Sequence, residues 1–136
     1  MDISNGIPQT RVKIAIVHAH KLTREVIAKT LSAKLAADAV GFGCLEDLLR
    51  SSMDYDVFVV FSEFGPSKME QSYGCKWIRK LRPQAQVFAM LQRRHFERKG
   101  TPPSSDQMNF CIAEDLNGLA TMIRRRLEAQ AAKLTA

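Results

Sequence analysis

Two histidines after the first apolar run of the chain are the first residues that could do chemistry. His18 and His20 stand two positions apart, directly after Arg11–Val17, an alternating run typical of a β-strand. Imidazole nitrogens bind transition metals, and Cys44 or Cys75 could complete such a ligand set. Two loop histidines at this spacing are a weak metal signature, so we predict no metal site.

The most strand-like run of the chain, Tyr55–Glu63, carries an unexpected side chain near its end. An apolar run of this kind is typical of a central parallel strand covered on both faces, and such sheets place their chemistry at the carboxyl ends of the strands. Here that end carries Phe61, which can neither ionise nor act as a nucleophile. Ser62 and Glu63 follow. Glu63 would point the same way as Phe61, and a solvated loop carboxylate is its simplest interpretation.

The cysteines give no support for metal, redox or nucleophilic chemistry. Cys44, Cys75 and Cys111 are widely spaced and form no CxxC pair. We expect free thiols in a reducing compartment, with Cys111 in the core. No nucleophile–base pair emerges from the sequence, so we predict neither an enzyme nor a cofactor.

Length and composition indicate one compact domain. The chain has 136 residues, of which 46% are hydrophobic and 25% charged. It contains no apolar stretch of membrane-spanning length and no recognisable signal peptide, so we expect a cytoplasmic protein with no membrane partner. The net charge of +6 allows an acidic partner. The basic groups show no interleaving with aromatic residues, and solvated helix faces and loops explain them most simply.

Strand-like runs alternate with helix-like segments along the chain. We predict strands at 11–17, 39–43, 55–61, 86–91 and 109–113, and helices at 22–35, 44–52, 69–81 and from 116 through 128 into 129–133. Asp115 can cap the last helix. This order predicts an α/β, flavodoxin-like three-layer sandwich: a five-stranded parallel sheet of order 2-1-3-4-5 with helices on both faces.

Some segments are less regular. We expect 64–67 to form a turn and 92–108 to be irregular, because two prolines exclude a long helix there. The helix at 69–81 should turn one side to the core. The residues expected on that side are Tyr73, Trp77, Ile78 and Leu81. We divide the chain into a flexible leader at 1–10, a domain at 11–128 and a helix extension or linker at 129–136.

These motifs resemble the receiver domain of response regulators, specifically the kind that begins NarL/LuxR-type transcription regulators. The segment 12–25 is similar to the family's first strand, acidic pair and helix start, where "IVDDHPLVRE" is typical. Asp56–Phe61 resembles the third strand, "DVVLLD", and Gly74–Arg82 resembles the third helix, "G-x-x-x-x-R-x-L-R". Gln86–Leu91 and Asn109–Ala113 occupy the last two strands, so the resemblance covers about residues 11–128.

The resemblance implies a phosphotransfer site whose residues are all replaced. In the family, two acidic residues hold magnesium, an aspartate accepts the phosphoryl group, and a hydroxyl and a lysine respond to it. The acidic pair falls on His18 and Ala19, the acceptor on Phe61, the hydroxyl on Leu91 (or Gln92 after a one-residue slip) and the lysine on Ala113. None keeps the required chemistry. We therefore predict a degenerate, atypical receiver that needs neither magnesium nor phosphate.

These replacements make the cleft at the carboxyl edge of the sheet apolar. It either collapses into additional core or stays open, between His18, Phe61 and Leu91, as a small cavity for an organic ligand. We expect collapse, because apolar side chains at such a site need only packing to explain them.

The resemblance further implies a phosphorylation-independent regulatory and dimerisation domain of a bacterial LuxR-type transcription regulator, acting as a homodimer. The first and last helices lie side by side in that subfamily. The possible interface residues are Leu116, Leu119, Ile123, Arg124 and Leu127. Leu134–Ala136 is similar to the start of the "LTxRE" motif that opens the family's helix-turn-helix region, so DNA binding would need an output domain outside this chain. The alternatives are a small-molecule-sensing domain and a standalone protein-interaction adaptor.

Overall fold

A computed structural model describes residues 11–63, 65–99 and 107–135. Its strands are β1 (Lys13–Val17), β2 (Asp38–Phe42), β3 (Val57–Ser62), β4 (Gln86–Leu91) and β5 (Met108–Ile112). Its helices are α1 (Lys21–Leu35), α2 (Leu45–Leu49), α3 (Pro66–Gln71), α4 (Tyr73–Leu81), α5 (Arg93–Lys99) and α6 (Leu116–Thr135).

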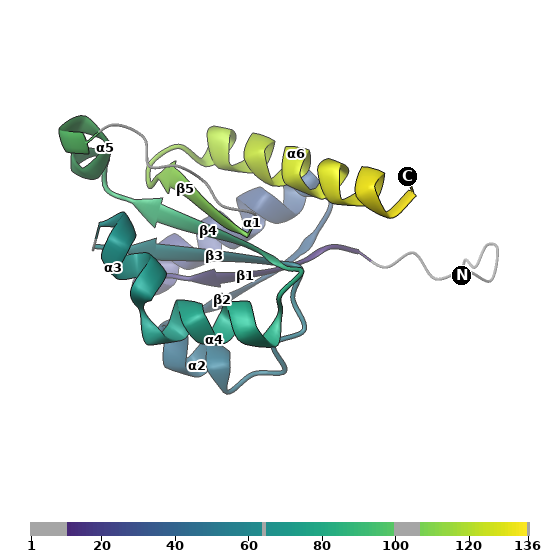
Figure 1. Ribbon diagram of the computed structural model, residues 1–136, viewed down its shortest axis with the longest axis horizontal. Helices are drawn as coiled ribbons and strands as arrows, with labels where there is room; N and C mark the ends of the chain where they lie inside the picture. Colours follow the sequence, from purple (N-terminus) through teal and green to yellow (C-terminus); the bar gives the residue numbers. More distant parts are fainter. Residues whose placement is uncertain (1–10, 64, 100–106, 136) are drawn as a thin grey trace.

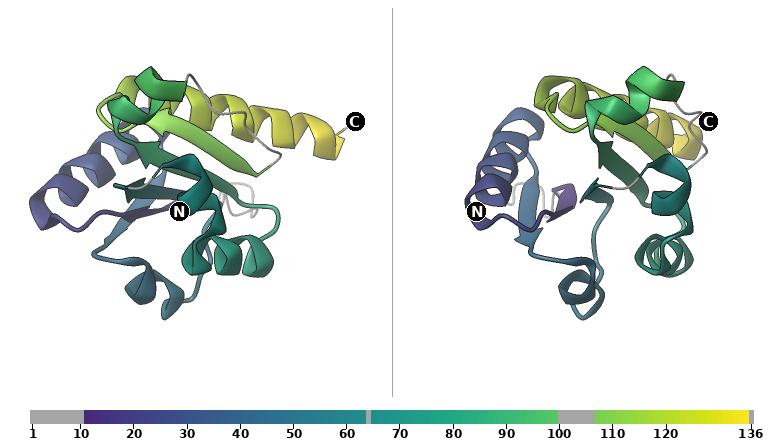
Figure 2. Two further views of the ribbon diagram at one scale, coloured as in Figure 1. Left: turned by 60° about the vertical axis from the view of Figure 1, so that its left-hand side comes forward. Right: turned by 90° about the vertical axis from the view of Figure 1, so that its left-hand side faces the viewer.

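The strands form one parallel sheet in the order β2-β1-β3-β4-β5, which confirms the predicted flavodoxin-like fold. Helices cover both faces of the sheet (Figure 1 and Figure 2). The central strand β3 extends beyond its neighbour β1. The last pair between them is Val17 with Val60, so Phe61 lies one residue past the paired end of β1. Phe61 thus stands at the carboxyl edge, between two strand ends.

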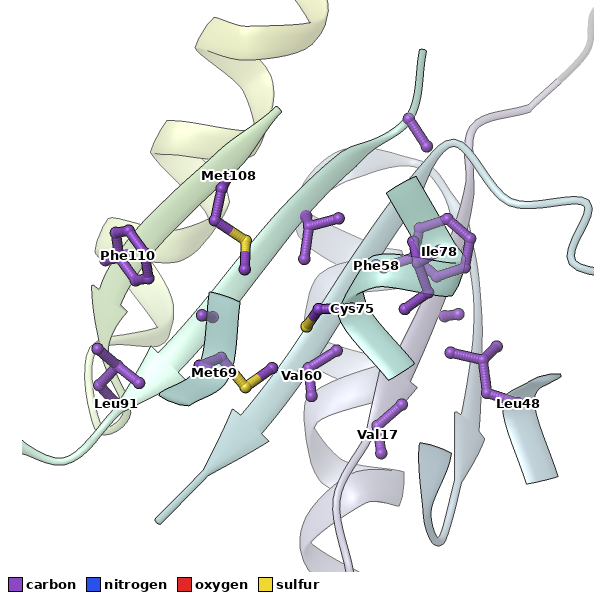
Figure 3. Packing of buried hydrophobic residues seen from close by; sticks show 14 of the residues in the cluster. Val17, Leu48, Phe58, Val60, Met69, Cys75, Ile78, Leu91, Met108 and Phe110 are labelled. Carbon is purple, nitrogen blue, oxygen red and sulfur yellow. The ribbon is translucent and has the colours of Figure 1, made fainter. Parts of the chain in front are cut away.

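Two apolar clusters, one on each face of the sheet, form the core. The alternation of β3 divides it between them: Phe58 and Val60 belong to one cluster, Val57 and Val59 to the other. On the first face lie α2, α3 and α4, which contribute Leu48, Met69, Cys75 and Ile78 (Figure 3). On the second face lie α1 and α6, which contribute Ile27, Leu31, Leu119 and Ile123. Cys111 is buried in this second cluster, as predicted.

The predicted single helix at 69–81 is wrong, because the chain forms two helices there. The break lies at Ser72, whose backbone is extended (φ −62°, ψ 147°) and whose hydroxyl accepts a hydrogen bond from the Cys75 backbone N–H at 3.2 Å. Ser72 therefore caps α4. The helix before it begins at Pro66, inside the segment expected to be a turn, because proline fits the first turn of a helix. Phe64 lies outside the described residues.

The core-facing side of α4 also differs from the prediction. Its buried residues are Gly74, Cys75 and Ile78, whereas Tyr73 and Leu81 are exposed. A Cβ on Gly74 would lie 2.6 Å from Leu45 Cδ1, so this glycine lets α4 approach α2 closely. Glycine weakens a helix in general, but here its missing side chain allows α4 to pack against α2.

Other departures lie at the edges of elements. The segment 93–99 forms the helix α5 where we expected irregular structure, and residues 100–106, which include both prolines, lie outside the described residues. The predicted leader at 1–10 also lies outside them.

The last helix agrees with the prediction. The α6 helix runs unbroken from Leu116 to Thr135, and an Asp115 carboxylate oxygen accepts the Gly118 N–H at 2.8 Å, as the capping prediction requires. Among the described helices, none combines the length and the apolar character needed to span a membrane.

Candidate functional site

Phe61 makes its closest ring contact with His18, at the carboxyl edge of the sheet. The two ring centroids lie 4.9 Å apart and the rings meet edge to face at 66°. Phe61 is half-buried and packs at the margin of the cluster beneath α1 and α6. An aromatic pair therefore occupies the place where the resemblance puts an acceptor aspartate and the first acidic residue.

The His18 imidazole is held in one orientation by its own loop. Its Nδ1 accepts a hydrogen bond from the His20 backbone N–H at 3.0 Å. Burial lowers the pKa of His18 below its ordinary value of 6.5, and electrostatic repulsion from the neighbouring His20 and Arg24 side chains lowers it further. An imidazole whose Nδ1 accepts in this way carries its proton on Nε2 when neutral, so His18 offers one N–H donor to the site.

Backbone contacts fix the rest of this loop. The His20 Nδ1 accepts from the Thr23 backbone N–H at 3.3 Å and so caps α1. Arg24 reaches back from the first turns of α1 and donates one guanidinium nitrogen to the carbonyl oxygens of His18 at 3.2 Å and Ala19 at 3.3 Å. The Arg24 side chain passes over Gly41 of β2, where a Cβ would come within 3.1 Å of its Cδ. The two residues at the acidic-pair positions are thus held by an intramolecular cation.

A groove of about 430 Å³ opens beside Phe61, between the first turns of α1 and α6. The apolar residues that define it are Leu22, Val26, Ile27, Phe61, Ala113 and Leu116, with His18, Thr23 and Glu114 supplying the polar atoms. Leu22 and Val26 are 67% and 59% exposed, so the rim contributed by α1 is apolar and open to solvent. The expected collapse is therefore incomplete on this side of the sheet: Phe61 and Ala113 pack at the margin of the second cluster, but α1 and α6 leave a groove beside them.

Collapse is right for Leu91, which lies on the opposite face. Leu91 is fully buried in the cluster under α3 and α4, together with Met69 and Phe110 (Figure 3). Successive residues of a strand point to opposite faces, so Leu91 cannot line the groove that Phe61 lines. The structure brings together His18, Phe61 and Ala113; Leu91 belongs to the core and Ala19 is exposed outside the groove.

Two acidic residues near this edge, Glu63 and Glu114, have environments of different kinds. Glu114 lines the groove and pairs with Arg93 of α5, with 3.4 Å between Oε1 and Nε. Glu63 is exposed, as expected, and its backbone carbonyl lies 3.3 Å from His95 Nε2. Neither carboxylate therefore replaces the oxygen cluster that a hard cation needs.

The residues at the receiver positions do not fit a magnesium ion. The acidic-pair and acceptor positions carry imidazole, methyl and phenyl groups, none of which is a hard oxygen ligand. Across the residues that the structure describes, no three side chains of His, Cys, Asp or Glu come together as a metal site. Of the residues considered for a metal, His20 already caps α1 and Cys75 is buried in the core.

The proposed dimer residues on α6 have unequal access to a partner. Leu119 and Ile123 are 1% and 0% exposed, so they pack on the sheet and cannot contact a second chain. Leu116 and Leu127 are half-buried, and Arg124 is exposed. The Arg124 guanidinium donates to the Lys34 carbonyl oxygen at 2.8 Å, which joins α6 to the end of α1.

The contribution of α1 to the groove was missed from the sequence, because all the apolar residues of α1 were assigned to a single core-facing stripe. They form two rows. Leu22 and Val26 form one row, and Ile27, Leu31 and Leu35 form the other. Val26 and Ile27 are neighbours, about 100° apart around the helix, so they cannot both face the core. A helical projection of α1 contains this information.

Comparison with known proteins supports the fold. No family model matches the chain, and no curated protein matches it either. Among solved structures, the response regulator DrrB, an OmpR/PhoB homolog of Thermotoga maritima, superposes with a TM-score of 0.63 at 18% identity, over 89% of this chain and 54% of that one. The chain therefore spans about half the length of that regulator.

The BeF3-activated receiver domain of DrrB matches at nearly the same level. Its TM-score is 0.61 at 18% identity, and the match covers 88% of this chain and 99% of that one. Because a single domain is matched almost end to end, with the same sheet order, the chain has the fold of a response-regulator receiver domain.

Proposed function

We propose that this chain is a regulatory domain that uses the receiver fold without phosphotransfer. The contact between Phe61 and His18 carries the proposal, because two positions that need carboxylates for magnesium and phosphate are filled by a packed aromatic pair. Its role is two-component-like signalling in the cytoplasm, and no enzymatic step is required of it.

The finer assignment is to a bacterial LuxR-type transcription regulator. It is supported by the strand and helix motifs at 12–25, 56–61 and 74–82. The continuous α6 helix provides a rigid connection toward an output domain, through which alone DNA would be bound.

Incubation of the chain with acetyl phosphate tests whether phosphotransfer is absent. We expect no phosphorylated species by intact-mass spectrometry and no shift of backbone amide NMR signals on addition of beryllofluoride. The DrrB receiver domain, which has a BeF3-activated form, is the positive control. A phosphoryl adduct on this chain, or beryllofluoride shifts at the carboxyl edge, contradicts the proposal.

The proposed homodimer uses the exposed part of the surface that α1 and α6 share. Leu22 and Val26 are exposed apolar residues on α1, and the half-buried Leu116 lies across the groove from them. We expect sedimentation equilibrium to show a dimer at micromolar concentration and the double variant Leu22→Glu/Val26→Glu to be monomeric. Val40→Glu, at another exposed apolar position, should leave the dimer intact. A wild-type monomer contradicts the dimer.

The open groove favours a second candidate function, the sensing of a small organic ligand. Its volume of about 430 Å³ lies within the range of small-molecule sites, and it combines apolar walls with His18 and Thr23 as polar groups. A thermal-shift screen of small aromatic and aliphatic compounds should find one that raises Tm, and Ala113→Trp, which fills the groove, should abolish the shift. A screen in which no compound shifts Tm counts against sensing and leaves the absence of phosphotransfer untouched.

A further inference from the structure

A row of large apolar side chains, two exposed and one half-buried, runs along the outer side of α4, on the face of the sheet opposite to the groove. Tyr73, Trp77 and Leu81 follow one another at intervals of four residues, so they form one ridge along the helix, here called the α4 ridge. Tyr73 is 70% exposed and Leu81 is 48% exposed. None of the three belongs to either core cluster.

The core of the protein does not need this ridge. The inner side of α4 is filled by Gly74, Cys75 and Ile78, which are all buried, and Gly74 sets the close approach to α2. On the outer side, Tyr73 and Leu81 therefore leave apolar area in contact with solvent. Tyrosine and tryptophan are the residue types that most often dominate binding energy at protein interfaces.

A basic row accompanies the ridge. Lys76 and Lys80 are exposed, and helical geometry places them beside Tyr73 and Trp77. The Lys80 ammonium lies 5.3 Å from the centre of the Trp77 ring. Within the described part of the chain, neither lysine forms an ion pair, so both charges are available to a partner. Basic and aromatic residues are thus interleaved on this helix, contrary to the expectation from sequence.

We propose that the α4 ridge is a docking surface for an acidic segment of a protein partner, whose apolar side chains pack against the ridge. Anchors at positions i, i+4 and i+8 of one helix give such a segment a continuous apolar strip to contact. The two lysines supply the complementary charge and would favour fast, oriented association.

Two other occupants fit the surface less well. A second copy of this chain would bring Lys76 and Lys80 against the same lysines of its partner, and like charges oppose that contact. Single-stranded nucleic acid would need an open ring face for stacking. The Trp77 ring contacts Tyr73 at 5.7 Å, and the Lys80 ammonium lies 5.3 Å from its centre, so a base stacked on Trp77 would compete with these contacts.

The single tryptophan of the chain lies in the ridge, so a change in Trp77 emission reports a change at this surface. Random peptides without tryptophan, displayed on phage, would be selected on the full chain. The winners would then be synthesised and titrated while Trp77 fluorescence is recorded. We expect the enriched peptides to combine Asp and Glu with Leu, Ile or Phe and to shift Trp77 emission. Enrichment of neutral or basic peptides, or of peptides that leave the emission unchanged, overturns the proposal.

Matched variants separate the ridge from general charge. Tyr73→Ala and Lys76→Glu/Lys80→Glu should each weaken the selected peptides by about tenfold or more, with unchanged circular dichroism. Lys21→Glu/Lys29→Glu makes the same change in net charge on α1 and should leave the affinity unchanged. Equal weakening by both double variants would show long-range charge attraction alone and would overturn the ridge.

A direct competition tests nucleic acid. Fluorescently labelled oligo(dT) and oligo(rA) should bind more weakly than the acidic peptides and fail to displace them. If an oligonucleotide binds more tightly than the peptides and quenches Trp77 fluorescence, the proposal of an acidic protein partner is wrong and the ridge binds nucleic acid. The ridge lies apart from the Phe61 site, so these results are independent of the acetyl phosphate experiment.

Discussion

On the two sides of the sheet, large apolar side chains at the carboxyl edge lie in different environments. Leu91 and Phe61 both stand where the resemblance expects a polar side chain, on adjacent strands. On one face, Met69 of α3 covers the end of β4 and Leu91 becomes core. On the other, α1 and α6 leave a groove and Phe61 stays half-exposed beside it. The helices packed over a strand end, and not the side chain at that end alone, decide whether the position is core or surface.

The largest expected effect is at the covered side. Leu91→Ala leaves a cavity among fully buried neighbours and should lower the free energy of unfolding by about 2–5 kcal/mol. Urea denaturation followed by circular dichroism measures the loss. A change within experimental error would show that the α3 side is as open as the α1 side.

Phe61→Ala should cost less, about 1–2 kcal/mol, although phenylalanine is the larger side chain, because part of its area is already in water. The same urea titration decides the order of the two variants. If Phe61→Ala destabilises as much as Leu91→Ala, then the groove is closed in solution and the contrast between the two sides fails.

Variants of Asp115 measure how much the N-terminal cap stabilises α6, which forms one wall of the groove. Asp115→Ala removes the acceptor for the Gly118 N–H and should cost about 1 kcal/mol. Asp115→Asn keeps an acceptor oxygen and should cost distinctly less. Identical losses in the two variants would mean that charge near the helix start, and not the hydrogen bond, stabilises this end of α6.

The smallest expected effect is a pH dependence from His18. Because its folded pKa is lowered below 6.5, the unfolded chain binds more protons as the pH falls below that value. The His18 contribution to stability should therefore be complete above pH 6.5 and decline as the pH falls through the folded pKa. Unfolding measured between about pH 5 and pH 8 should lose this slope in His18→Asn. NMR titration of the ring protons locates the midpoint, and a midpoint above 6.5 would contradict the buried placement of this ring.

The architecture could be predicted from the sequence because the central strands of the sheet are strongly apolar runs. Val57–Val60 and Gln86–Leu91 are buried along almost their whole length, and runs of this kind admit few interpretations. Alternation with helices then limits the topology to a right-handed, doubly wound sheet.

The outward-facing elements were harder to predict, for physical reasons that differ from residue to residue. Ser72 can sit inside a helix or cap one, and only its extended backbone decides between them. Tyr73 and Trp77 look like core residues by type, but the small Gly74 takes the place against α2. The groove depends on how α1 and α6 are placed over the carboxyl edge of the sheet, and this placement cannot be predicted from a local sequence pattern.

Arg24 determines how the loop at the carboxyl edge depends on its surroundings. A site filled by an exchangeable ion stabilises the folded state by an amount that grows with the logarithm of the ion concentration. The guanidinium of Arg24 is part of the chain, so its concentration at the carbonyl oxygens of His18 and Ala19 is fixed by the fold. Under the proposed function, the stability of this loop is therefore independent of the concentration of divalent ions. It is determined by the amino-acid sequence and does not vary with the ionic conditions in the cell.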